Sequence, residues 1–113
     1  AAALATLEEY KAENIFERAG NIEKKFEESC HSLKGIKNVV DIRNIGLVGG
    51  IELATREDGL TKRAYDVFDW CFNEGLMVRF TGETICVSPP LVVNEGQIDE
   101  IFTTIREAII SIK

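Results

Sequence analysis

Residues 75–91 read GLMVRFTGETICVSPPL, and this stretch decides how the rest of the chain can be arranged. On both sides of its polar centre, apolar residues stand at every second position: Leu76, Val78, Phe80, Ile85 and Val87. A period of two is typical of half-buried strands, so the stretch predicts a β-hairpin. Pro89 and Pro90 have no N–H to donate, and we expect the strand pairing to stop before them.

The register of this hairpin decides which side chains share a face. With Arg79 opposite Thr84, all five apolar side chains gather on one face, whereas Phe80 opposite Thr84 would mix the two sets. We therefore predict the first register. It leaves Arg79 on the more polar face, among small hydroxyl and thiol side chains.

Two further strands are predicted before the hairpin, at residues 39–42 and 48–55, joined through residues 43–46. Three glycines lie in or near the connection: Gly46, Gly49 and Gly50. A phosphate loop needs a helix directly after it, and here a strand follows. We interpret these glycines as a turn, a bulge or a close approach of two backbones.

Two helices are predicted at the start of the chain. Residues 1–12 favour a helix, and a break near Glu13 separates them from a second helix that Gly35 should end. Asn14 and Glu17 have the spacing of a capping box for this second helix.

Two more helices are predicted around the hairpin. Residues 60–74 place a set of apolar residues on one face, namely Leu60, Ala64, Val67, Phe68, Cys71 and Phe72. The last helix has a capping box of Asn94 with Gln97 and a hydrophobic staple of Val93 with Ile98.

This order of elements favours a two-layer α+β fold, with helices packed on one face of a small, mainly antiparallel sheet. The length of 113 residues fits a single domain, residues 1–113. Within it, residues 1–34 form a helical lead-in and residues 38–113 the α+β core.

Composition excludes several functions. The chain has 19 acidic and 13 basic residues, so its net charge of -6 predicts no attraction to nucleic acid or anionic lipid. It lacks the run of about 20 apolar residues that would span a membrane. Cys30, Cys71 and Cys86 are odd in number and widely spaced, which favours free thiols in a cytoplasmic protein. With His31 the only histidine and no CxxC pair, we expect no metal site.

The first residues, AAALATLEEYK, favour a helix from the start, with no initiating Met and no capping residue. We therefore expect the sequence to be a fragment of a longer polypeptide. No Ser/His/Asp set or nucleophile elbow is present, and we expect no catalytic residue in it.

Arg79 is the strongest candidate for a binding residue. On a strand before a hairpin turn, its planar guanidinium could hold a carboxylate through two parallel hydrogen bonds, which Lys could not imitate. An ordinary surface or salt-bridge arginine is the alternative, and the residues alone leave both open.

Several ordered segments carry a resemblance to a known family: GLVGGIEL, GLMVRFTGETICVSPPL and NEGQIDEIFTTIREAI, preceded by AAALATLEEYKAENIFERA and SLKGIKNV. Together they resemble the C-terminal part of class III pyridoxal-phosphate aminotransferases, nearest to β-alanine:pyruvate and ω-amino acid:pyruvate transaminases. The resemblance covers essentially the whole chain.

The resemblance implies the small C-terminal domain of a fold-type I homodimeric enzyme that moves an amino group from an ω-amino acid or amine to pyruvate or a similar keto acid. It implies pyridoxal 5'-phosphate in the full-length parent. The Schiff-base lysine and other cofactor contacts of the family belong to a large domain upstream, so the fragment should bind no cofactor and be inactive alone. Arg79 matches the arginine that receives the substrate carboxylate. The alternative is a stand-alone α+β module that binds a ligand or partner.

Overall fold

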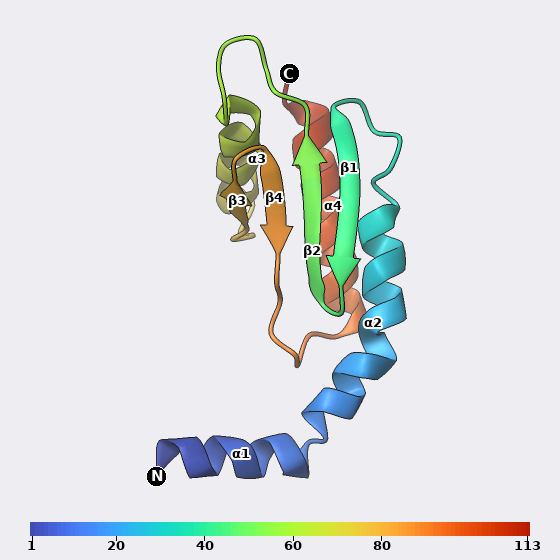
Figure 1. Ribbon diagram of the computed structural model, residues 1–113, viewed down its shortest axis with the longest axis vertical. Helices are drawn as coiled ribbons and strands as arrows, with labels where there is room; N and C mark the ends of the chain where they lie inside the picture. Colours follow the sequence, from blue (N-terminus) through green and yellow to red (C-terminus); the bar gives the residue numbers. More distant parts are fainter.

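The chain folds around a four-stranded antiparallel sheet in the order β1-β2-β4-β3 (Figure 1). The computed structural model describes all residues, 1–113. The elements, in chain order, are α1 Ala2–Ala12, α2 Ile15–His31, β1 Val39–Ile45, β2 Val48–Leu53, α3 Lys62–Asn73, β3 Arg79–Thr81, β4 Thr84–Val87 and α4 Glu95–Ser111.

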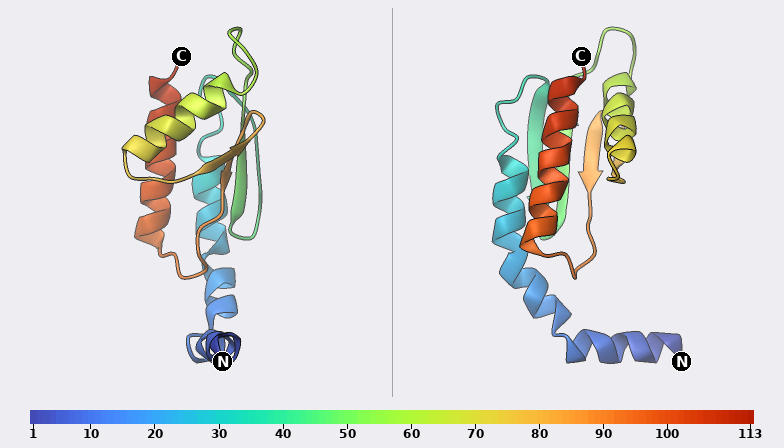
Figure 2. Two further views of the ribbon diagram at one scale, coloured as in Figure 1. Left: turned by 90° about the vertical axis from the view of Figure 1, so that its left-hand side faces the viewer. Right: turned by 180° about the vertical axis from the view of Figure 1, so that it is seen from behind.

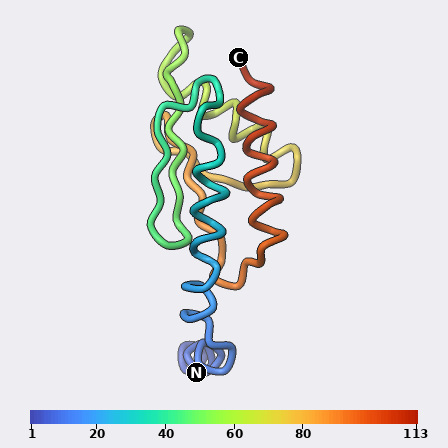
Figure 3. Tube along the Cα trace, turned by 90° about the vertical axis from the view of Figure 1, so that its right-hand side faces the viewer, coloured from blue at the N-terminus to red at the C-terminus, as the bar shows by residue number.

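Helices α2, α3 and α4 lie on one face of the sheet, and no helix covers the other face (Figure 2). Figure 3 shows α2 and α4 side by side along the β1–β2 hairpin. Helix α1 extends away from this body (Figure 1). The predicted two-layer α+β fold, with helices on one face of an antiparallel sheet, is confirmed.

The core lies between the sheet and the helices. Along β2, buried residues alternate with more exposed ones, as a strand with one covered face requires. Ile51 and Ile85 of the sheet are fully buried against residues such as Phe26, Ile98 and Ile105 of the helices. Burying a side chain of this size contributes about 1.5–3 kcal/mol relative to leaving it in water.

The break predicted near Glu13 is present, but the capping box predicted for α2 is wrong. Asn14 has a left-handed backbone with φ +53°, and its side chain makes no hydrogen bond to the helix N–H groups. It donates to the carboxylate of Glu17 instead. The left-handed backbone makes the sharp bend between the two helices and takes Asn14 out of the capping geometry.

Helix α3 buries a narrower face than predicted. Ala64, Val67 and Cys71 are buried, but Leu60 is 76% exposed and Phe72 is 54% exposed. Leu60 lies outside because the helix begins only at Lys62. The capping box of Asn94 with Gln97 predicted for the last helix is confirmed in α4.

Strand β1 extends further than predicted, to Ile45, so the connection predicted at residues 43–46 is wrong. Gly46, with φ +54°, and Leu47 alone make the turn. A polar residue of the extended part finds a partner on a helix: Asn44 Oδ1 lies 2.9 Å from Nε2 of His31 in α2.

The register predicted for the second hairpin is also wrong, by two residues. Arg79 pairs with Cys86 and Phe80 with Ile85, and β3 contains only Arg79–Thr81. Because side chains alternate with a period of two, this slip leaves every predicted face unchanged. Strand β4 ends at Val87, before the two prolines, as predicted.

Candidate functional site

Arg79 is the first residue of β3, at the edge of the sheet. Its partner across the hairpin is Cys86, and both side chains belong to the face that no helix covers. The Arg79 side chain is exposed. The structure therefore places the predicted site residue where a molecule lying on the bare side of the sheet can reach it.

The guanidinium of Arg79 differs from those of the other five arginines. Each of the others bonds to at least one oxygen of the chain: Arg18 to Leu91, Arg43 to Asp41 and Glu52, Arg56 to Asp58 and Asp66, Arg63 to Ala54, and Arg106 to Ser32. Arg79 has no such partner. Its five N–H donors are free for a ligand.

A second arginine lies on the same face but is already occupied. Nη1 of Arg43 lies 2.9 Å from Oδ2 of Asp41 and 3.0 Å from Oε2 of Glu52. The hydrogen bonds to Glu52 and Asp41 raise the pKa of the Arg43 guanidinium. Two carboxylates of the sheet already balance the charge of Arg43, whereas Arg79 has no such partner.

A hollow of about 580 Å³ opens on this face between the two hairpins. Its lining includes Ile45, Val48, Gly50, Thr84 and Cys86. Gly50 helps to keep it open, because a Cβ there would come within 3.3 Å of Cγ2 of Thr84. Cys86 is the cross-strand partner of Arg79, but Arg79 itself is not one of the residues that line the hollow.

The hairpin that carries Arg79 is packed on α3 through its covered face. The ring of Phe80 lies 5.5 Å from that of Phe68 and 6.1 Å from that of Tyr65, centroid to centroid. Sequence reasoning did not single out these rings as supports of the site. The available signal was the spacing of three between Tyr65 and Phe68, which puts two aromatic side chains on one side of a helix.

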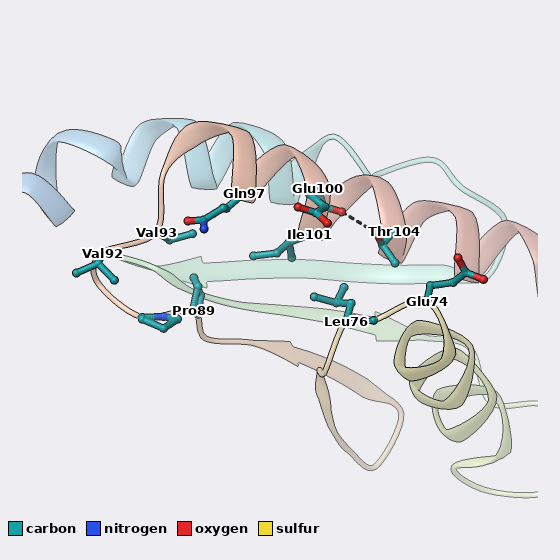
Figure 4. Close-up of a pocket in the computed structure, with 11 residues that line it drawn as sticks. Glu74, Leu76, Pro89, Val92, Val93, Gln97, Glu100, Ile101 and Thr104 are labelled. Atoms are coloured by element: carbon teal, nitrogen blue, oxygen red, sulfur yellow. Dashed lines mark hydrogen bonds between the residues drawn. The ribbon is translucent and has the colours of Figure 1, made fainter.

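A second concavity, of about 330 Å³, lies on the helix side, between α4 and the segments that precede β3 and follow β4 (Figure 4). Leu76, Pro89, Val93 and Ile101 form much of its wall. Arg79 takes no part in it, because Arg79 belongs to the opposite face of the sheet. The two concavities are therefore separate.

The residues present do not form a site for pyridoxal phosphate. Such a site needs a desolvated lysine amine, but six of the seven lysines are exposed. The seventh, Lys25, is half-buried and its Nζ lies 2.6 Å from Oδ1 of Asp99. Nor does the chain bring three His, Cys, Asp or Glu side chains together as metal ligands. None of its helices has the length and apolar character needed to cross a membrane.

Comparison with known proteins gives a consistent result. The profile of the family described as aminotransferase class-III matches residues 1–109. The chain is 47% identical to the omega-aminotransferase of Caulobacter vibrioides, over 96% of this chain and 25% of that protein. It is 34% identical to the beta-alanine–pyruvate aminotransferase of Pseudomonas aeruginosa, over 96% of this chain and 24% of that protein.

Solved structures agree in fold. The adenosylmethionine-8-amino-7-oxononanoate aminotransferase of Methanocaldococcus jannaschii superposes with a TM-score of 0.87 at 32% identity, covering 96% of this chain and 26% of that one. A thermostable omega transaminase from Pseudomonas jessenii, at 22% identity, has a TM-score of 0.88, over 94% of this chain and 25% of that one. The chain thus spans about a quarter of the length of the proteins it matches.

Proposed function

Since this chain belongs to the class-III aminotransferase family, we propose that it is the small C-terminal domain of a pyridoxal-phosphate-dependent aminotransferase. The complete enzyme transfers an amino group from an ω-amino acid or amine to pyruvate or a similar keto acid. The names of two similar relatives, an omega-aminotransferase and a beta-alanine–pyruvate aminotransferase, support this substrate class.

In this proposal residues 1–113 act as one domain, and a large domain of the same polypeptide holds the cofactor. Two such polypeptides form a homodimer in the cytoplasm, a compartment in which the free thiols of Cys30, Cys71 and Cys86 persist. The isolated domain is inactive, because its lysines are exposed or paired. Family membership over residues 1–109 leads us to prefer this function to a stand-alone binding module.

The role we assign to this domain is to hold the substrate carboxylate with Arg79. The observation that carries the assignment is that Arg79 alone, of six arginines, has no partner in the chain and lies on the uncovered face. Its fork can donate two parallel hydrogen bonds to one carboxylate. The cofactor, when bound, supplies the chemistry of amino transfer, whereas Arg79 orients the acceptor relative to it.

The experiment is to replace Arg79 in the complete enzyme and measure the kinetics with pyruvate and with butanal, an acceptor that has no carboxylate. Hydrogen bonds to charged groups contribute about 1.5–3 kcal/mol. We therefore expect Arg79→Ala to raise the KM for pyruvate roughly 10- to 100-fold, and Arg79→Lys to raise it less, because Lys keeps the charge although it cannot form the fork. The KM for butanal and the cofactor absorbance should not change.

Arg43→Gln is the matched control, since Arg43 lies on the same face but is held by Asp41 and Glu52. Its KM for pyruvate should equal that of the wild type. An unchanged KM for pyruvate in Arg79→Ala would refute the role of Arg79.

A further inference from the structure

Glu83 occupies the two-residue turn between β3 and β4 and reaches out of the sheet to the start of α3. Its Oε1 lies 2.6 Å from the backbone N of Thr61 and accepts a hydrogen bond from it. Its backbone oxygen accepts from the N–H of Leu53 at 2.9 Å. Oε2 is buried and has no partner. One residue thus ties the turn of the hairpin both to β2 and to α3.

The start of α3 is suited to receive this carboxylate. Thr61, the N-cap residue, has a left-handed backbone with φ +63°, and its side chain caps no N–H group. The first turn contains no acidic residue and begins with Lys62 and Arg63. Helix N-termini carry unsatisfied N–H groups and a partial positive charge. Glu83 supplies from a distant turn the acceptor that the helix lacks locally.

This contact lies in the hairpin that carries Arg79. Only three residue pairs join β3 to β4, and Arg79 is at the far end of the ladder from the turn. The contacts that hold the hairpin against α3 include the ring of Phe80, next to Arg79, and the carboxylate of Glu83. Strand pairing places Arg79 on the uncovered face, and the contacts with α3 decide how firmly the turn of its hairpin is held.

We propose that Glu83 is a positioning residue for the substrate-binding arginine: by bonding to the N-terminus of α3, it fixes the turn and so the direction of Arg79. This inference rests on the proposed carboxylate role of Arg79. Glu83 itself contacts no substrate.

The test compares Glu83→Ala with Glu83→Gln in the complete enzyme. Glu83→Ala removes the acceptor, and we expect the KM for pyruvate to rise about fivefold, the factor that corresponds to transferring the whole stability cost of one lost helix cap to the orientation of Arg79. The KM for butanal should stay the same, because that acceptor does not use Arg79. Glu83→Gln keeps an oxygen that can accept from Thr61 and should restore a KM close to that of the wild type.

Amide hydrogen exchange gives a readout at the contact itself. In Glu83→Ala the N–H of Thr61 should exchange faster, and in Glu83→Gln it should remain protected. Glu107→Ala is the matched control, because Glu107 is an exposed residue of α4, on the helix side of the sheet. If Glu83→Ala does not fold, Glu83→Asp, which is one methylene shorter, provides the same comparison with a smaller rise in KM.

The double variant Arg79→Ala/Glu83→Ala separates this inference from the proposed function. We expect it to have the same KM for pyruvate as Arg79→Ala alone, since Glu83 acts through Arg79. If Arg79→Ala raises the KM and Glu83→Ala does not, or if Glu83→Ala raises the KM for pyruvate and butanal equally, the positioning role is overturned and the proposed function stands. If Arg79→Ala leaves the KM unchanged, both fall.

Discussion

The two hairpins of the sheet have similar turns, but they differ in whether the arginine on the uncovered face is free to bind a ligand. Each closes through a two-residue turn with a glycine at positive φ, Gly46 at +54° and Gly82 at +58°. Each presents one arginine on the uncovered face. In the first hairpin Arg43 is held by two carboxylates of its own sheet, and in the second Arg79 is held by none.

The hairpins also differ in how they are anchored. The first pairs over six residue pairs and packs directly on α2, where a Cβ on Gly49 would lie only 3.0 Å from Sγ of Cys30. The second pairs over three residue pairs, is joined to β2 through β4, and contacts α3 through side chains such as Phe80 and Glu83. Residue type alone therefore does not assign a role to an arginine. Its partners and the anchoring of its strand do.

Gly49→Val should have the largest effect on the free energy of unfolding, because it disturbs the packing of the first hairpin on α2. Gly49→Val places new atoms against Cys30 and Phe26, because a Cβ at Gly49 would lie 3.3 Å from the nearest carbon of the Phe26 ring. Overpacking of this kind costs typically 1–3 kcal/mol, and we expect a loss of about 3 kcal/mol in the free energy of unfolding. Urea titration followed by circular dichroism measures it.

Gly20→Ala is the control for that substitution. Gly20 lies in α2 with no atom within 4 Å of a Cβ at that position. Replacing it should raise the free energy of unfolding by roughly 0.5–1 kcal/mol, because Ala favours the helix. A Gly49→Val variant as stable as the wild type would show that β2 and α2 are not in close contact at Gly49.

A smaller effect, on the KM for pyruvate, should follow from giving Arg79 a carboxylate partner of the kind that Arg43 has. Asp41 holds Arg43 from two positions away along the strand, and Thr81 stands at the same spacing from Arg79 on the same face. Thr81→Asp should therefore engage Arg79 and raise the KM for pyruvate about threefold in the complete enzyme, because exposed ion pairs contribute up to about 1 kcal/mol.

Thr103→Asp adds the same charge to an exposed position of α4, on the other side of the sheet, and should leave the KM unchanged. An equal rise in both variants would mean that net charge, not capture of Arg79, weakens pyruvate binding. The effect of Thr81→Asp should shrink at high salt, since exposed charges are screened.

The smallest effect concerns the thiols associated with the two hairpins. Cys30, beneath the first, and Cys71 are buried, and desolvation raises the pKa of each thiol from 9.0 to about 11. Cys86, on the second, is half-buried and faces the hollow. At pH 8 iodoacetamide should label Cys86 in the folded chain and all three thiols in urea, which mass spectrometry can count.

The raised pKa values of the Cys30 and Cys71 thiols also predict how the free energy of unfolding changes with pH. Unfolded thiols lose their protons near pH 9, before the buried ones do. The unfolded chain then binds fewer protons, so the free energy of unfolding should fall as the pH rises from about 9 to about 11.

In the labelling experiment, labelling of Cys30 at pH 8 as fast as in urea would contradict its burial.

The sequence was sufficient to predict the fold class and the faces of the hairpin. The alternation from Leu76 to Val87 sorts side chains correctly, because a slip of two residues changes no face. For the same reason it could not decide the register. Turn geometry decides it: Gly82, at positive φ, allows the two-residue turn.

The long-range partners of Arg43 and Glu83 could not be predicted in the same way. Glu52 lies nine residues from Arg43 on another strand, and Thr61 lies 22 residues from Glu83. Such contacts depend on how strands and helices are arranged in space, and no local spacing in the sequence indicates that arrangement. Arg79 was identified by its place in a motif, while its lack of a partner emerged only from the fold.

Because β3 is at the edge of the sheet, Arg79 should also affect how readily the protein self-associates. An edge strand presents unpaired N–H and C=O groups to which a strand of another molecule can bind, and a charged side chain on that strand discourages such pairing. Arg79→Lys keeps this protection and Arg79→Ala removes it. The alanine variant should therefore precipitate at lower protein concentration than the lysine variant, whatever their kinetics.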